Sequence, residues 1–529
     1  MSRVKELENL FTRGKITRRE FIARVSALGL ATAVSPALWY SPAQASKPNK
    51  GGRLRVGCTG GSTSDSMDPA TLTSGMNLFV QWQARNNLVE LNHKLSPVPE
   101  LAESWEASPD ATKWVFKLRK GVEFHNGKIM DSDDVIYSIN HHRGKDSKSA
   151  AKGIVAPIKD VKTDGKDTVI FYMEGGNADF PYILADYHLT IFPAGTKGAE
   201  FEKCIGTGGY IKREWEPGVR FFAKRNPNYW KEGRAHFDEA ETLSITDINA
   251  RTNALKTGQI DVMDRPELKT LRLLEKLPGI QVLKGPSLTH YSMITLCNTT
   301  PYNNNDVRLG LKYAIDREHA LKTILQGYGI LGNDHPISPL MKYHANDLPQ
   351  RHYDPDKARY YLKKAGVLGH TFKLHTADAA FAGANDTALL FQQNAAKAGI
   401  KVDVVREPDD GYWSNVWRKK PFSMCYWMGR ATCDWMFSTE YAADAPWNDM
   451  NWKNKRFNEL LVKARGELDE KKRTNMYAEM QRIVRDDAGA IIIMFAQMIT
   501  PATKKLRYEN YSTNIILDGG RLPERWWFA

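Results

Sequence analysis

The chain of 529 residues lacks several features that mark common classes of protein. It has five cysteines but no C-x-x-C pair, so a zinc ribbon or a thioredoxin-like site has no basis in the sequence. Neither G-x-S-x-G nor H-E-x-x-H occurs, so the sequence does not indicate the nucleophile elbow of an α/β-hydrolase or the zinc-binding helix of a zincin. There is no internal repeat and no polybasic arm, although the formal net charge is +13. We therefore expect no metal, no cofactor and no nucleic-acid partner.

Two short segments match parts of the serine β-lactamase pattern. Residues 149–152 spell S-x-x-K and residues 256–258 spell K-T-G. The third element, S-D-N, is missing, and the nearest imitation at Ser132 precedes the S-x-x-K instead of following it. Because motifs this short recur by chance in a long chain, we do not expect this enzyme activity.

Residues 1–45 have the organisation of an export signal. Arg18 and Arg19 precede an apolar stretch that ends in small residues at Ala43 and Ala45, as a signal peptidase requires. Charge and proline interrupt the stretch, which is too short for the roughly 20 apolar residues of a membrane span. The T-R-R-x-F-I spelling resembles the twin-arginine signal. We predict export by the twin-arginine machinery, cleavage after Ala45 and a periplasmic location.

Strand and helix signals alternate through most of the second half, which is typical of α/β lobes with partly parallel sheets. The length calls for two or more such lobes. Apolar periodicity predicts helices over 77–91, over 304–325 with Asn304 or Asn305 as N-cap, and within 466–487. Residues 54–58 and 489–495 read as strands.

The cysteines suggest two disulfides, because pairs oxidise in the periplasm. Cys425 and Cys433 are close enough in sequence to close a small loop, and Cys58 and Cys297 each end a strand-like run. We therefore predict the pairs Cys58–Cys297 and Cys425–Cys433, with Cys204 left free.

A dense group of tryptophans lies between residues 413 and 452, mixed with charged side chains and turn-rich sequence. Flat aromatic faces with a few fixed charges suit the burial of a small polar ligand. We interpret the group as a pocket wall and expect Trp413, Trp427 and Trp435 to contact the ligand.

Several long phrases resemble the family 5 extracellular solute-binding proteins, the periplasmic receptors of peptide, nickel, opine and related ABC importers. The longest phrase covers residues 99–139. Others follow in the family's order at 65–69, 206–230, 254–262, 303–321 and 353–366. The likeness extends through nearly the whole chain after residue 45, and it makes the K-T-G part of a helix-end phrase.

The resemblance implies an α/β architecture, the two-lobed periplasmic binding protein fold of type II, with a ligand cleft between the lobes. We expect lobe 1 at 46–298 with an extra subdomain at about 90–205, lobe 2 at 299–499, and a C-terminal return to lobe 1 at 500–529. Hinge strands would cross near 297–301 and 497–503. Members close around a ligand, and the closed form is what the membrane permease recognises. No chemistry on the ligand is implied, so the chain is expected to be a receptor and not an enzyme.

The sequence departs from the family pattern at residues 426–437. Peptide-binding relatives usually carry aspartates there, whereas this chain has Arg430 and Cys433 in positions where acidic residues are common, and Asp434 at one often held by proline. A cation in place of an anion reverses the preferred charge of the ligand and favours a carboxylate or a phosphate. We predict a ligand with an acidic group, such as an opine-like conjugate or an acidic peptide, bound by Arg430 and Asp434.

Two further residues and three less favoured functions complete the prediction. In relatives, the segment matching the loop after the first strand faces the cleft, so Ser62 and Ser64 are candidate hydrogen-bond donors. An oligosaccharide receptor of the same fold remains open because tryptophans stack on sugar rings. A periplasmic hydrolase and a chaperone are the remaining two functions. The expected partners are a small ligand and the permease subunits of an ABC transporter, with the receptor itself a monomer.

Overall fold

The computed structural model describes residues 48–529 apart from 73 and 410. The predicted signal peptide, with Arg18, Arg19 and the cleavage site after Ala45, lies outside the described residues. Within the part of the chain that is described, no helix is both long enough and apolar enough to cross a bilayer.

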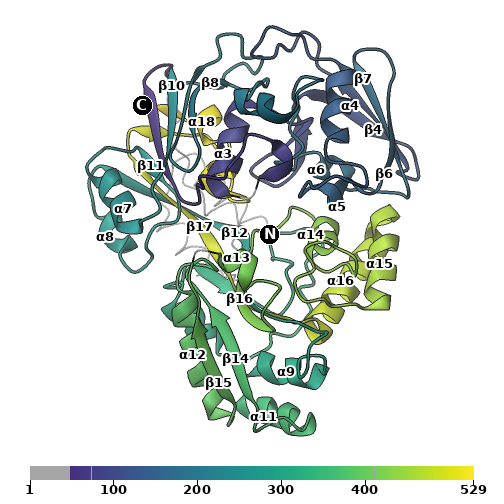
Figure 1. Ribbon diagram of the computed structural model, residues 1–529, viewed down its shortest axis with the longest axis vertical. Helices are drawn as coiled ribbons and strands as arrows, with labels where there is room; N and C mark the ends of the chain where they lie inside the picture. The colour runs from purple at the N-terminus through teal and green to yellow at the C-terminus, as the bar shows by residue number, and fades with distance from the viewer. Residues whose placement is uncertain (1–47, 73, 410) are drawn as a thin grey trace, which may run out of the picture. The chain divides into compact units, whose positions relative to one another are not determined.

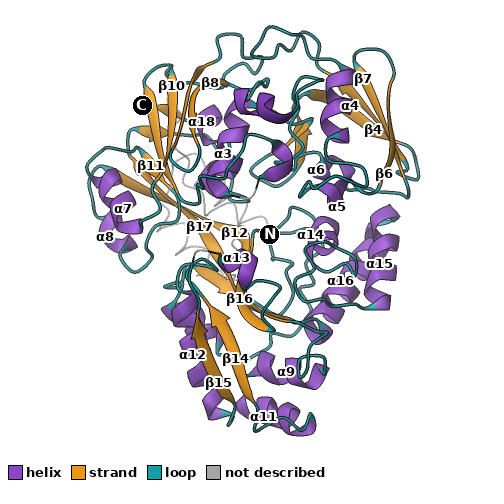
Figure 2. Ribbon diagram, viewed as in Figure 1, coloured by secondary structure: helices purple, strands orange, loops and turns teal. Residues whose placement is uncertain are grey.

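One mixed sheet of eleven strands runs through the protein (Figures 1 and 2). β1 pairs in parallel with β10 and β11, and β14 with β15 and β16, while β12 and β17 are antiparallel. The strands in spatial order are β15 (Lys401–Arg406), β14 (Thr371–Thr376), β16 (Phe422–Trp427), β12 (Ile280–Thr295), β17 (Ala490–Thr503), β11 (Val262–Met263), β1 (Arg53–Cys58), β10 (Glu239–Ser244), β9 (Arg220–Arg225) and β8 (Tyr210–Glu216), with β13 (Gly329–Leu331) paired to β17.

The long strands β12 and β17 connect the two halves of this sheet. Their first and last residues pair at Ile280 and Thr503 beside β11, and the ladder continues to Ile294 and Ala490 beside β16. Its register shifts between Pro286 and His290. We call β11, β1, β10, β9 and β8 the lobe 1 strands, and β16, β14 and β15 the lobe 2 strands. The lobe limits and hinge positions given above stay predictions.

A separate antiparallel sheet of four strands forms within residues 102–173. It has its own core, in which Phe116, Phe171 and Phe180 pack edge to face. Its strands are β4 (Ala102–Ala107), β5 (Lys113–Leu118), β7 (Thr168–Met173) and β6 (Ile158–Thr163); two small ribbons pair β2 (Val89–Leu91) with β3 (Pro97–Pro99) and β18 (Leu506–Arg507) with β19 (Trp527–Phe528).

Helices pack against both parts of the large sheet. Next to the lobe 1 strands are α3 (Gly75–Ala84), α7 (Ile248–Lys256), α8 (Leu271–Glu275), α17 (Ile516–Gly519) and α18 (Leu522–Arg525); beside the smaller sheet are α4 (Ser132–Asn140), α5 (Lys152–Val155) and α6 (Phe180–Ile183) (Figure 1). The remaining helices belong to the lobe 2 side: α9 (Asn305–Tyr313), α10 (Arg317–Thr323), α11 (Pro355–Lys364), α12 (Ala384–Lys397), α13 (Tyr412–Asn415), α14 (Cys433–Glu440), α15 (Lys455–Gly466) and α16 (Glu470–Asp487).

Two predicted helices differ from the structure. The helix expected over 304–325 begins as predicted, with Asn304 accepting a hydrogen bond from Asp306 N, but it divides because Asp316 caps a new helix through His319 N. The helix expected over 77–91 ends at Ala84. Arg85 N still donates to Gln81 O over 2.9 Å, but Asn87 N donates to Glu100 Oε2 over 3.0 Å in place of a helical carbonyl.

The predicted disulfide Cys58–Cys297 is wrong, because both cysteines are free. Cys58 ends β1 and packs in the core of the lobe 1 strands. Cys297 follows the lobe 2 end of β12 and packs against a different core, with the helices α14, α15 and α16. Both residues end strand-like runs, as expected, but the two runs end in separate cores.

The predicted disulfide Cys425–Cys433 is also wrong, and both thiols are free. Cys425 lies in β16 with its Sγ 3.6 Å from the Asp449 carboxylate, and Cys433 begins α14 and donates to Lys342 O over 3.2 Å. Burial raises the pKa of both thiols well above the usual value. Short sequence separation therefore did not bring the two sulfurs together.

Candidate functional site

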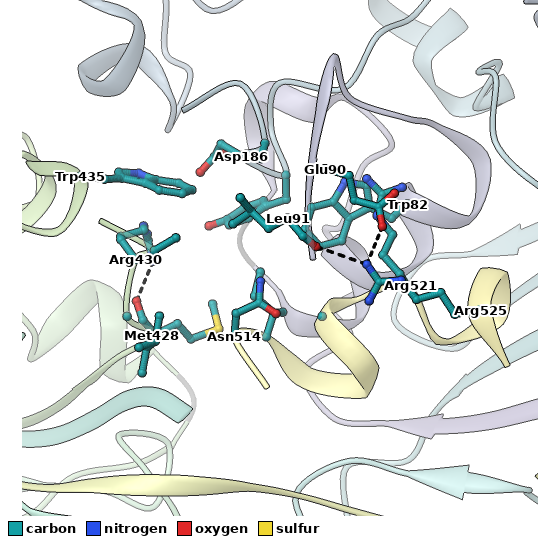
Figure 3. Close-up of a pocket in the computed structure, with 17 residues that line it drawn as sticks. Trp82, Glu90, Leu91, Asp186, Met428, Arg430, Trp435, Asn514, Arg521 and Arg525 are labelled. Carbon is teal, nitrogen blue, oxygen red and sulfur yellow. Dashed lines mark hydrogen bonds and ion pairs between the residues drawn. The ribbon is translucent and has the colours of Figure 1, made fainter. Parts of the chain in front are cut away.

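A cavity of about 40 Å³ lies between side chains from both sides of the protein (Figure 3). Trp435 and Arg430 line it on the lobe 2 side. The opposite wall comes from α3, from β2, from residues 185–187 and from the C-terminal segment 514–525. The walls therefore unite segments that are far apart in the sequence, which is the arrangement of a cleft between lobes.

The loop between β16 and α14 positions Arg430. A Cβ at Gly429 would lie only 2.2 Å from Leu288 Cβ, so glycine lets the loop pass directly against β12. Arg430 Nη1 donates to Met428 O over 2.6 Å, and its guanidinium lies 5.6 Å from the centre of the Trp435 ring. Only 7% of Arg430 is exposed. The cation is thus held in one place by a carbonyl and an aromatic face.

Several polar atoms of the cavity wall have no partner in the structure. Arg430 Nε, Trp435 Nε1 and Asn514 Oδ1 are buried and make no hydrogen bond with any described residue. No carboxylate oxygen of the described chain lies within 4 Å of Arg430 either, since no ion pair forms there. A buried donor without an acceptor is costly, so these atoms fit a site whose missing partner is a ligand.

Asp186 faces Arg430 across the cavity (Figure 3). Its carboxylate accepts a hydrogen bond from His188 N over 2.9 Å, and a second hydrogen bond of 2.6 Å joins it to His188 Nδ1. Burial acts to raise the pKa of Asp186, but His188 and Arg430 outweigh it, and the pKa lies below its ordinary value. Asp186 is therefore ionised and already partnered, which leaves Arg430 with binding capacity of its own.

The arginines of the C-terminal segment are neutralised within the protein. Arg525 Nη2 lies 2.6 Å from Glu90 Oε1, and Arg521 Nη1 lies 3.0 Å from Glu100 Oε1. Arg521 also lies 4.7 Å from the centre of the Trp82 ring. These cations shape the wall, whereas Arg430 is the lining cation without an acidic partner among the described residues.

Two of the predicted site residues line the cavity, namely Arg430 and Trp435. Trp427, in contrast, is buried in the lobe 2 core, where its Nε1 donates to Asp449 over 3.1 Å. Trp413 is 38% exposed and lies at the edge of the neighbouring Tyr426 ring. Of the six tryptophans between 413 and 452, all in the described part of the chain, Trp435 is the one that contributes to this wall.

The other three predicted residues lie elsewhere. Asp434 does not line the cavity, and its Oδ1 accepts a hydrogen bond of 3.1 Å from Arg465 Nε. The hydroxyls of Ser62 and Ser64 bond to each other over 2.9 Å in an exposed loop. That loop packs against Gly218 in the turn between β8 and β9.

The remaining lining residues have no signal in the sequence. This holds for the aromatic and polar ones, Trp82, Glu90, Asp186, Tyr187, Asn514, Arg521 and Arg525, whereas Met428, Gly429 and Ala431 belong to the segment 426–437 around Arg430. Their segments are brought together only by the tertiary fold, and none forms a motif. In residues 48–529, with 73 and 410 set aside, no group of three or more histidine, cysteine, aspartate and glutamate side chains is placed to hold a metal ion. The cavity offers hydrogen-bond donors and aromatic faces, which suit binding.

Comparison with known proteins identifies the family. Residues 96–449 match the bacterial extracellular solute-binding proteins, family 5. The chain belongs to this family. The dipeptide-binding protein of Escherichia coli K12 is 27% identical over 497 residues, which cover 85% of this chain and 91% of that protein. The protein is thus a periplasmic solute-binding receptor of the ABC importer type, as its sequence predicted.

Solved structures of the same family have the same two-lobed fold. The binding protein DppA of Helicobacter pylori, in complex with the peptide STSA, superposes with a TM-score of 0.81 at 25% identity, over 91% of this chain and 99% of that one. AgaA of A. tumefaciens R10, in complex with agropinic acid, superposes with a TM-score of 0.80 at 23% identity, over 90% and 99% of the two chains. The predicted fold class is confirmed.

Proposed function

We propose that this receptor captures a small solute with an acidic group, a peptide or an opine-like conjugate, and delivers it to the permease of an ABC importer. Arg430 is the anchor of the acidic group. The observation that carries the proposal is the buried guanidinium of Arg430, which has no carboxylate within reach in the described chain and leaves its Nε without a partner.

A buried cation is unfavourable unless an anion pairs with it. A ligand carboxylate or phosphate would accept the free N–H groups of Arg430 and receive a further hydrogen bond from Trp435 Nε1. These contacts come from the lobe 2 side, while Asp186 and Arg521 approach from the other side. A ligand touched from both sides stabilises the closed arrangement, because the open arrangement lacks half of the contacts.

The ligands of similar proteins are consistent with this class. One relative is a dipeptide-binding protein, another is a glutathione-binding protein, and a structure of the same fold holds agropinic acid. The oligosaccharide alternative rested on the tryptophan group, and most of that group lies in the lobe 2 core instead of the cavity. We therefore favour the acidic solute.

The route to the periplasm is part of the proposal. Arg18 and Arg19 support export through the twin-arginine machinery, and the small residues at Ala43 and Ala45 support cleavage after Ala45. The folded receptor would then act as a monomer that binds and releases the solute without chemical change.

Differential scanning fluorimetry tests the ligand class. A panel of acidic conjugates, neutral dipeptides and oligosaccharides is added to the full-length protein and to Arg430→Gln. A ligand that binds only the native state adds about 2.7 kcal/mol of stability at a hundredfold excess over Kd, which raises the melting temperature. We expect a shift with acidic conjugates for the wild-type protein and none for Arg430→Gln.

Arg418 provides the matched control, because its guanidinium also lies 5.6 Å from a tryptophan ring, that of Trp417. Arg418 does not line the cavity, so Arg418→Gln should keep the full shift. A shift with neutral peptides that survives Arg430→Gln would contradict the proposal.

A further inference from the structure

A second and larger cavity adjoins the first. Its volume is about 120 Å³, against about 40 Å³ for the first. Met428 borders both cavities, and the neighbours Ile515 and Ile516 line the first and the second respectively. A ligand that occupies the Arg430 site therefore has space to continue in this direction.

The walls of the second cavity are mainly aromatic and aliphatic. The rings of Tyr291 and Phe381 stack at 4.1 Å with an angle of 5° between their planes. Leu268, Met498 and Ile499 are among the other lining residues. Such walls favour the burial of an apolar or aromatic portion of a ligand.

Arg265 is the positively charged residue in the lining of this second cavity. It follows the lobe 1 strand β11, and its guanidinium lies 5.7 Å from the centre of the Tyr426 ring of the lobe 2 strand β16. Arg265 is exposed within the cleft. No carboxylate oxygen of the described residues lies within 4 Å of its guanidinium, so it forms no ion pair there. It is thus a second lining cation without an acidic partner in the described chain, on the opposite lobe from Arg430.

The backbone of Arg265 is held in an unusual conformation. Its φ is +41°, in the left-handed region that side chains with a Cβ seldom adopt. Arg251 Nη2 donates to the carbonyl of Arg265 over 3.0 Å, and Arg251 itself is buried. Strained backbone that the surroundings hold in place is typical of ligand-binding positions, and here it directs a cation to the cleft.

We propose that the second cavity, with Arg265, Tyr291, Tyr426 and Phe381, is a second subsite of the same ligand. The ligand would carry two anionic groups separated by an apolar or aromatic portion, one group at Arg430 and the other at Arg265. This proposal rests on the function proposed above. Because the two arginines belong to opposite lobes, a dianion would join the lobes, whereas a monoanion would pair with one of them.

Two probes that differ by one carboxylate test the subsite. N-succinyl-L-phenylalanine has two carboxylates joined by a short amide-linked chain that also carries an aromatic side group, and N-butyryl-L-phenylalanine replaces the succinyl carboxylate with a methyl group. Calorimetric titration of the full-length protein should give at least a tenfold tighter Kd for the succinyl probe. In Arg265→Gln we expect this preference to disappear while the Kd of the butyryl probe stays within about twofold.

Two further variants make the result specific. Arg265→Lys keeps the positive charge and should retain most of the preference. Arg418→Gln is the control, since Arg418 also has a left-handed φ, +62°, and lies over an aromatic ring outside both cavities.

The outcomes separate the two proposals. If Arg265→Gln weakens the binding of both probes equally, Arg265 acts only by packing against Tyr426, and the second subsite is contradicted. A preference for the succinyl probe that survives this substitution would also contradict the second subsite. If both probes bind and depend on Arg430 but not on Arg265, the proposed function stands and the second subsite falls. Failure of both probes to bind the wild-type protein would contradict both proposals.

Discussion

The carboxylate of Asp179 lies 2.7 Å from the guanidinium of Arg473, and the pair joins the α6 end of the smaller sheet to helix α16. Both side chains are buried. Beside them, Ala178 N donates to Arg465 O over 3.0 Å. Figure 1 shows α5 next to α14 in the same region, so this pair is a second connection between the two sides, away from the β12–β17 connection.

A double-mutant cycle measures how strongly this pair holds the closed arrangement. Removing one partner of a buried ion pair leaves the other charge buried, at a cost of about 3–5 kcal/mol. For Asp179→Asn, Arg473→Met and the double variant, we expect a coupling of about 2 kcal/mol or more in urea unfolding.

The control is the exposed pair Arg456–Glu479, which has the same separation of 2.7 Å. The double-mutant cycle for this exposed pair should give a coupling free energy of less than about 1 kcal/mol. An equally small coupling for Asp179 and Arg473 would mean that both groups are solvated, as they would be with the cleft open.

Buried histidines make the stability fall with acidification. Burial lowers the pKa of four of them to about 3 or 4: His125, His142, His290 and His335. Between these values and about 6.5 the unfolded chain binds protons that the folded chain does not, so stability is lost as the pH falls. At pH 5, each of these histidines should lower the free energy of unfolding by about 2 kcal/mol relative to its contribution at pH 7.

His142 is a suitable test of this pH dependence, because its Nδ1 bonds only to Ser149 Oγ, over 2.7 Å. His142→Gln should reduce the difference in unfolding free energy between pH 7 and pH 5 by about 2 kcal/mol, whatever its effect at pH 7. The exposed His352 is the control, and His352→Gln should leave the difference unchanged. Asp449 and Asp518, whose pKa values burial raises to about 6, act in the opposite direction, so the comparison is made between each variant and the wild-type protein.

All five thiols should remain unpaired after export. Each is free in the structure, and burial raises the pKa of Cys58, Cys204 and Cys297 as it does for the other two. Protonated, buried thiols react slowly. Titration with a thiol reagent, without reductant, should therefore find five groups in denaturant and almost none in the native protein. Fewer than five in denaturant, restored by reduction, would show a disulfide that the structure lacks.

The sequence was sufficient for the fold and for one side of the site. The long phrase over 99–139 and its companions identify the family. The departure from the family pattern at 426–437 predicts Arg430, and the tryptophan group predicts Trp435; both line the cavity, whereas Asp434 does not. These residues are five positions apart, so a local pattern could reveal them. Arg265, Asp186 and Arg521 come from three distant segments, and only tertiary packing brings them to the cleft.

The errors have a common physical cause. The indole N–H groups of Trp427 and Trp452 donate to the carboxylates of Asp449 and Asp487, so aromatic and charged residues close in sequence form a core and not a pocket wall. The cysteines show the same limit, since a position at the end of a strand does not reveal which core the side chain enters. A sequence pattern gives the composition of a neighbourhood but not the direction of each side chain.

Lys231 is the centre of a buried charge network behind the cavity. Its Nζ lies 2.6 Å from Glu90, 2.8 Å from Glu100 and 3.0 Å from Glu524. Burial opposes the charged form of Lys231, but the three carboxylates raise its pKa well above the usual value. Since Glu90 also lines the cavity, this network fixes one wall of the binding site.

Lys231→Met should lower the free energy of unfolding by about 3–5 kcal/mol at pH 7, because it leaves buried carboxylates without their shared cation. The exposed Lys342 is the control: it lies 3.0 Å from Glu470, and Lys342→Met should lower the free energy of unfolding by less than about 1 kcal/mol.

The sign of the pH dependence gives a second test. In the wild-type protein, Lys231 helps to hold the pKa values of Glu90 and Glu524 below their usual values, so the stability it contributes is present at neutral pH and is lost as the pH falls. The deficit of Lys231→Met should therefore be smaller at pH 4.5 than at pH 7. A deficit that is the same at both pH values would mean that its cause is lost packing of the lysine side chain and not the loss of its charge beside the carboxylates.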